Sequence, residues 1–217
     1  IVSAFWYLRM EEVRREQEAV KRDVEYSQQR LRLRLLERQE QLMRLARDIA
    51  NREVDPRQFE IRAESLVAQY GELMALSWID DRRRVVAVQA SPSVKAARDW
   101  MEDGILKPGE VESGYGLARD LLQPVYSQPV GVGKAEPILQ LHLPITPRGK
   151  FAGELVAEYS VDALLRYGVP AEILAKYAVA LLDSKGQTLA GQSIPDRPGL
   201  SEFLPWSGKV NEFEIPV

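Results

Sequence analysis

Residues 76–88, LSWIDDRRRVVAV, predict a β-hairpin that opens a sheet. Apolar residues lie on both sides of a charged turn, and an acidic residue stands where the first strand ends. Residues 178–191, AVALLDSKGQTLAG, repeat this order of apolar strand, acidic turn and second apolar strand. A shift of 103 residues superposes the two stretches and sets Ala87 against Ala190. We therefore expect the chain to begin a sheet twice, in two similar units.

The residues between the two hairpins predict the rest of the first sheet. Three further strands are expected at 124–132, 137–145 and 151–159. In the second of these, leucines alternate with Gln140 and His142, which gives one apolar sheet face and one face with polar side chains. The chain is thus expected to be α+β, with a five-stranded antiparallel sheet and helices, followed by the start of a second similar domain.

Helices are predicted before and between these strands. The region from Met10 to Arg52 contains no proline or glycine and predicts one long helix. The shorter helices begin at Asp55-Pro56, where a capping box is expected, and after Ser160 and Pro170. We also expect a short helix at 91–104, a glycine-rich loop at 104–116 and another short helix at 117–122.

The long helix has an apolar stripe with an eleven-residue spacing, a period that keeps a stripe nearly straight. The stripe residues are Val13, Val20, Val24, Leu31, Leu35, Leu42 and Ala46. We expect the early part to pair with another copy, giving a homodimer along residues 13–46, and the later part to lie on the globular domain. The arginines at 30, 32, 34 and 38 form either a solvated face or an anion site.

Composition excludes several classes of function. The 217 residues have a net charge of -3, so binding to nucleic acid is not expected. Cysteine is absent and His142 is the only histidine, so we expect no disulfide, no metal site and no cofactor. His142 lies in mid-strand without a nucleophile-elbow motif, and VGVGK at 130–134 lacks the spacing of a phosphate-binding loop. This part of the protein is therefore expected to be non-catalytic.

The first eight residues, IVSAFWYL, are uncharged and end in an aromatic pair before charged residues begin. This pattern is typical of a membrane span that leaves the bilayer, although eight residues are too few to cross it. An apolar helix end that packs on a partner is the other interpretation.

The predicted order of elements resembles the Cache (PDC) family of extracytoplasmic PAS-like sensor domains, in particular the double-Cache periplasmic regions of bacterial sensor histidine kinases. The likeness rests on the long helix, on the two hairpins and on FAGELVAEYSVDALLRYG at 151–168, a strand followed by a capped exit helix. The implied boundaries are the end of a transmembrane helix at 1–8, a stalk helix at 9–54, a membrane-distal sensor domain at 55–168 and an incomplete membrane-proximal domain at 169–217.

The resemblance implies a function and a location. It suggests a periplasmic region, anchored in a bacterial inner membrane, that binds a small molecule in the first domain and signals through helices. A two-component sensor histidine kinase is the implied full-length protein, and a diguanylate cyclase or a chemoreceptor is the alternative. A coiled-coil scaffold without a ligand is the competing function from another class.

Candidate ligand-binding residues follow from the same resemblance. Some Cache domains that bind amino acids have Arg-x-Trp-Tyr after the first hairpin, where the arginine holds the ligand carboxylate. Arg98 and Trp100 match this motif, and Met101 replaces the tyrosine. An arginine of this kind favours an organic anion, while a surface arginine beside a core tryptophan is the simpler interpretation. The other candidates are Tyr115, on the expected loop, Tyr126, Gln140 and His142.

Overall fold

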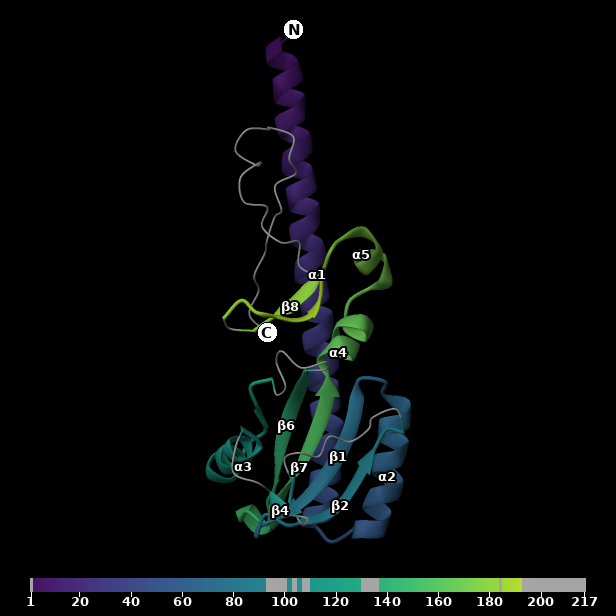
Figure 1. The fold of residues 1–217 in the computed structure, drawn as a ribbon, viewed down its shortest axis with the longest axis vertical. Coiled ribbons are helices and arrows are strands. Elements are labelled where there is room, and N and C mark those ends of the chain that lie inside the picture. The colour runs from purple at the N-terminus through teal and green to yellow at the C-terminus, as the bar shows by residue number, and fades with distance from the viewer. Residues whose placement is uncertain are drawn as a thin grey trace.

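The computed structural model describes residues 2–92, 101–102, 105–106, 110–129, 137–183 and 185–192, which Figure 1 shows as a ribbon. The helices are α1 (Val2–Ala50), α2 (Pro56–Gln69), α3 (Glu110–Leu121), α4 (Val161–Gly168) and α5 (Ala171–Lys176), with a 3-10 turn at Pro147–Gly149. The strands are β1 (Leu73–Asp80), β2 (Val85–Ala90), β3 (Met101–Glu102), β4 (Ile105–Leu106), β5 (Val125–Tyr126), β6 (Ile138–Ile145), β7 (Gly153–Ser160), β8 (Ala180–Leu182) and β9 (Thr188–Gly191).

Five strands form one antiparallel sheet in the order β2-β1-β7-β6-β5. This confirms the predicted α+β class and the five-stranded sheet. The strand expected at 124–132 is shorter than predicted, because only Val125–Tyr126 pairs with β6 and residues 127–129 do not continue the strand. Residues 130–132, which the prediction included, lie outside the described residues.

Helices α1 and α2 cover one face of the sheet, here called the α1 face, and α1 passes behind the sheet in Figure 1. Apolar side chains from both helices and from β1, β6 and β7 make one core, which includes Leu31, Leu35, Leu42, Ala46, Phe59, Ala63, Leu76, Leu141, Leu155 and Tyr159. The later part of the α1 stripe therefore packs on its own domain, as predicted. Since these side chains are buried within the chain, the expected dimer contact along 13–46 is wrong for the second half of that stripe.

Helix α3 packs on the opposite face of the sheet, here called the α3 face. The sequence predicted a loop at 104–116 and a helix only from residue 117, but the helix already begins at Glu110. The two glycines that suggested a loop lie inside this helix. Gly114 is needed there, because a Cβ at this position would collide with the ring of His142, whereas a Cβ on Gly116 would meet open space.

The helix expected at 91–104 is also corrected at its C-terminal end. Met101–Glu102 pairs as a short strand with Ile105–Leu106, and Ile105 forms a bridge with Arg84 beside the first hairpin. Pairing with a neighbouring segment has overridden local helix propensity here. Residues 93–100 lie outside the described residues.

The two hairpins share their turn geometry. In the first, the Asp80 carboxylate accepts hydrogen bonds from the backbone N–H groups of Arg82 and Arg84. In the second, Asp183 accepts from Lys185 and Gln187, at the same spacing. Both ladders also shift register at matching positions, between Trp78 and Ile79 in the first hairpin and between Leu181 and Leu182 in the second. The sequence repeat therefore corresponds to a repeated local structure.

The second hairpin belongs to a smaller apolar cluster with α4 and α5, beside the middle of α1 in Figure 1. Ser160 caps α4 by accepting a hydrogen bond from the Ala163 N–H, as predicted. The hydroxyl of Tyr177, just after α5, donates to Asp23 on α1 at 3.1 Å. Within the described residues, no helix contains an apolar stretch long enough to cross a membrane.

Candidate functional site

The α3 face contains a row of buried polar side chains in the middle of the sheet. The register of β6 and β7 places Gln140 opposite Glu158 and His142 opposite Val156. On the other side of β7, Ser77 of β1 lies opposite the same Val156. Because side chains two residues apart share a face, Glu154 lies on this same face, about 7 Å further along β7. All five polar side chains are buried. Polar groups are costly to bury unless they are hydrogen-bonded, so their partners are decisive.

Gln140 and Glu158 form a cross-strand pair. The amide nitrogen of Gln140 donates to Oε1 of Glu158 at 2.9 Å. The other end of the same amide, Gln140 Oε1, is buried and has no hydrogen-bond partner among the residues that the structure describes. The pair therefore fixes the amide so that its carbonyl oxygen remains open for another donor.

His142 and Glu154 form the second pair. His142 Nδ1 lies 3.1 Å from Glu154 Oε1, and both side chains are fully buried. Burial raises the pKa of Glu154, although the hydrogen bond and the charge of His142 act to lower it. In the part of the chain that the structure describes, the outer atoms of this pair, His142 Nε2 and Glu154 Oε2, have no hydrogen-bond partner, and neither has the buried Ser77 hydroxyl.

Helix α3 closes the Glu154 end of this face. Gly114 lies against the His142 ring, and the Tyr115 ring packs edge-on against Phe151 at 5.4 Å between centroids. The hydroxyl of Tyr115 donates to the backbone carbonyl of Asp80 at 2.9 Å. Burial, followed by the charge of Glu154, raises the pKa of Tyr115 to about 12. Tyr115 was predicted on a loop, but it is a buried residue of helix α3 whose hydroxyl is already engaged.

The structure places the other predicted site residues differently. Tyr126 pairs with Leu141, whose side chain is in the α1 core, so Tyr126 lies on the α1 face, away from Gln140 and His142. Burial raises its pKa to about 12. Arg98 and Trp100 lie outside the described residues.

Three polar residues of the site were missed from the sequence, namely Ser77, Glu154 and Glu158. In the strand GELVAEYS, the two glutamates are four residues apart and therefore share one face with Val156 between them. That spacing, set beside the polar alternation of Gln140 and His142, was the pattern that could have indicated a polar buried face.

A second buried polar cluster, here called the Glu72 junction, connects α1 with the start of β1 and the end of α4. Arg34 donates to both carboxylate oxygens of the fully buried Glu72, at 2.8 and 3.0 Å, and Arg38 lies 3.4 Å from one of them. Arg34 also donates to the Tyr167 carbonyl, and Arg38 stacks 3.5 Å from the Tyr70 ring centroid. Of the predicted arginine run, these two are paired within the chain, so they form neither a solvated face nor an open anion site.

Burial acts to raise the pKa of Glu72, but the hydrogen bond from Arg34, a backbone hydrogen bond and the charges of Arg34 and Arg38 outweigh it, so the pKa is lowered. The carboxylate is thus held in its ionised form. This cluster is satisfied by its own chain, in contrast to the α3 face.

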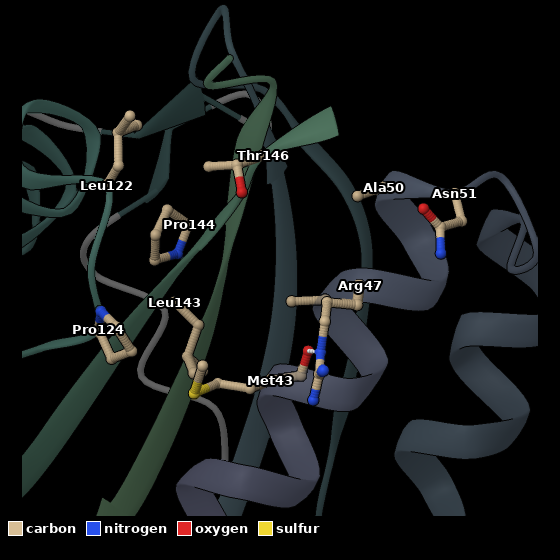
Figure 2. Close-up of a pocket in the computed structure, with 10 residues that line it drawn as sticks. Met43, Arg47, Ala50, Asn51, Leu122, Pro124, Leu143, Pro144 and Thr146 are labelled. Atoms are coloured by element: carbon tan, nitrogen blue, oxygen red, sulfur yellow. Dashed lines mark hydrogen bonds between the residues drawn. The ribbon is translucent and has the colours of Figure 1, made fainter. Parts of the chain in front are cut away.

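A hollow of about 290 Å³ lies between α1 and the end of β6. Figure 2 shows the residues that line it. Its lining is mostly apolar, with Arg47 extended along α1. It is lined by Met43, Ala46, Arg47, Ala50, Asn51, Leu122, Pro124, Leu143, Pro144 and Thr146. None of the candidate ligand residues is among them. In the described part of the chain, no group of three or more histidine or acidic side chains is placed to hold a metal ion.

Comparison with solved structures identifies the class of fold. The chain has the fold of the Cache, PAS-like ligand-binding domains of bacterial sensory receptors. No family model matches the sequence, and no curated protein matches it either.

Two solved structures illustrate the likeness. The ligand-binding domain of the Campylobacter jejuni chemoreceptor Tlp3, in complex with L-norvaline, is 13% identical with a TM-score of 0.59, over 82% of this chain and 70% of that one. The ligand-binding domain of the Pseudomonas fluorescens chemoreceptor CtaA, in complex with L-isoleucine, is 17% identical with a TM-score of 0.57, over 87% of this chain and 73% of that one. At these identities the comparison establishes the fold.

Proposed function

We propose that this chain is the ligand-sensing region of a membrane-bound signal-transduction protein, and that a small molecule binds on the α3 face. The observation that supports this is a set of four buried polar atoms, on Ser77, Gln140, His142 and Glu154, that have no partner within the described part of the chain. A buried polar group left unpaired costs about 1–3 kcal/mol. Several such groups on one face are therefore explained by a ligand that completes their hydrogen bonds. Domains of the same fold were solved with amino acids bound.

The proposed setting is the periplasm of a bacterium, with the N-terminal end of α1 nearest the inner membrane and residues 169–217 beginning a second, membrane-proximal domain. Helix α1 runs without interruption from Val2 to the sheet, so it can transmit a change in the domain along its axis. A ligand shifts such an equilibrium only by its differential affinity for the two states. The exposed side chains Tyr26, Leu33 and Leu36 on α1 offer a contact to a second copy.

Two output classes fit this sensory region. The sequence resemblance favours a two-component histidine kinase, and the solved domains with the same fold favour a chemoreceptor. ATP-dependent autophosphorylation of the full-length protein in membranes would support the kinase, and its absence together with methylation of the cytoplasmic part would support the chemoreceptor.

Ligand binding is testable on the chain itself. Thermal unfolding in the presence of amino acids, amines and organic acids should reveal a compound that stabilises the chain by about 2.7 kcal/mol at a hundred times its dissociation constant. Because His142 is the only histidine, selective isotope labelling of histidine gives a single imidazole signal, and that signal should shift when the compound binds. A compound that stabilises the chain without moving the His142 signal would contradict a site on the α3 face.

A further inference from the structure

We propose that the ligand of the α3 face is a cation with several hydrogen-bond donors, of the organic ammonium class. This inference rests on the proposed function, since it specifies what the α3 face would bind. It also departs from the organic anion that the sequence suggested. The argument uses the charge of the sheet, the hydrogen-bonding character of the open atoms and the burial of the carboxylates.

The charged residues of the five strands are all acidic, apart from His142 when it is protonated. None of the five strands contains a lysine or an arginine. Two of their acidic residues, Glu154 and Glu158, are buried on the α3 face, and the third, Asp80, is engaged in its own turn and with Arg84. An anionic ligand on this surface would meet carboxylates, and in a medium of low dielectric constant that repulsion is strong.

The open atoms mostly accept hydrogen bonds. Gln140 Oε1 is an acceptor, since the amide nitrogen of that side chain already donates to Glu158. Glu154 Oε2 is an acceptor when the carboxylate is ionised. When Glu154 is ionised and the imidazole is neutral, His142 donates through Nδ1, which leaves Nε2, the ring atom that faces Gly114, as an unpaired acceptor too. Only the Ser77 hydroxyl can act either way. A matching ligand must therefore bring N–H or O–H donors, and an ammonium group brings three and accepts none.

The burial of the Glu154 carboxylate makes a neighbouring cation important for its stability. Glu154 is fully buried, and among the described residues His142 is the side chain bonded to it. An ionised carboxylate in such a position is costly unless it has a cation beside it, and the raised pKa of Glu154 reflects that cost. A bound ammonium would supply the cation that the described side chains do not, whereas Glu72 obtains its cations from Arg34 and Arg38.

The test compares three small molecules of equal carbon number by titration calorimetry with the folded chain: 1,4-diaminobutane, 4-aminobutanoate and succinate. We expect at least one of the two amines to bind and succinate not to bind. Glu154→Gln and Glu158→Gln keep the shape of the side chain and remove its charge, so each should weaken amine binding about tenfold or more. Glu172→Gln, an exposed position on α5, is the matched control and should leave the affinity unchanged.

The outcomes separate this inference from the proposed function. Binding of succinate alone, with a shift of the His142 signal, would overturn the ammonium class and leave a ligand site on the α3 face. Amine binding that is unaffected by both glutamate variants, or that leaves the His142 signal in place, would overturn the ammonium site on this face. If none of the three molecules binds at millimolar concentration, the ammonium class is overturned, while a wider ligand screen still decides the proposed function. The His142 signal of the unmodified chain keeps the test independent of how the variants fold.

Discussion

The Glu72 junction and the α3 face are both buried and polar, but they differ in how their hydrogen bonds are satisfied. At the junction, one carboxylate is held by two guanidinium groups, one of them through a bidentate contact. On the α3 face, Gln140 donates to Glu158 and His142 lies beside Glu154, and four polar atoms of Ser77, Gln140, His142 and Glu154 have no hydrogen-bond partner among the described residues. A cluster that completes its own hydrogen bonds stabilises the fold, whereas one that leaves acceptors open is suited to bind something else.

Among the variants that test this difference, the largest loss of stability is expected when the carboxylate of Glu72 is removed. We expect Glu72→Ala to lower the free energy of unfolding by about 3 kcal/mol, the lower end of the range for a broken buried ion pair, because Arg34 and Arg38 retain some contact with solvent. Urea denaturation near neutral pH measures this. A loss below about 1 kcal/mol would show that the junction is a weak surface pair.

Glu72→Gln and Glu154→Gln each remove a charge and keep the shape of the side chain, and they should change the free energy of unfolding in opposite directions. The lowered pKa of Glu72 gives stability that is present above its ordinary value near 4.5 and lost as pH falls through the folded value, so Glu72→Gln destabilises at neutral pH. The raised pKa of Glu154 gives stability that is lost as pH rises through the folded value, so Glu154→Gln should stabilise at neutral pH. Both differences should shrink at low pH. A destabilised Glu154→Gln would show that His142 already neutralises this carboxylate.

The contact between α3 and the sheet gives the next largest effect. Gly114→Ala should cost about 2 kcal/mol, because its Cβ would collide with His142 and a well-packed interior tolerates extra atoms poorly. Gly116→Ala, in the same helix, meets open space and should stabilise by up to about 1 kcal/mol through helix propensity. Thermal unfolding of both variants measures the difference. Adding His142→Ala to Gly114→Ala should recover part of the loss, and equal effects of the two alanines would refute the close contact.

The smallest effect compares two serines. Ser160 caps α4, so Ser160→Ala should cost about 1 kcal/mol. The Ser77 hydroxyl has no hydrogen-bond partner in the described residues, so Ser77→Ala should leave stability unchanged or raise it slightly in the absence of ligand. Denaturation midpoints of the two variants provide the measurement. A loss of 1 kcal/mol or more in Ser77→Ala would mean that its hydroxyl is already satisfied in the free protein.

The elements with strong local patterns were predictable. The uninterrupted long helix, the Asp55 capping box and the Ser160 cap all follow from short-range rules, and the structure confirms them. The alternation of Gln140 and His142 between leucines also predicted correctly that both lie on one polar face of the sheet. These features depend on residues within one or two turns of each other, so a single sequence contains the information.

Other features depended on packing between distant segments. The glycines of α3 were interpreted as a loop because glycine is poor in helices, but Gly114 is required by the ring of His142, 28 positions further along the chain. The short β3–β4 ladder and the place of Tyr126 on the α1 face are likewise set by pairing with other strands.

The sequence by itself determined that this chain is α+β, that it begins two hairpins of one type and that one sheet face is polar. Periodicity, capping residues and turn residues act locally, which is why these results could be obtained without coordinates. Only the tertiary structure decided which charges meet. It paired Glu72 with arginines from α1 and placed Glu154 beside a histidine, because strand register and helix packing bring together residues far apart in the chain. That difference in pairing separates the stabilising cluster from the candidate binding site.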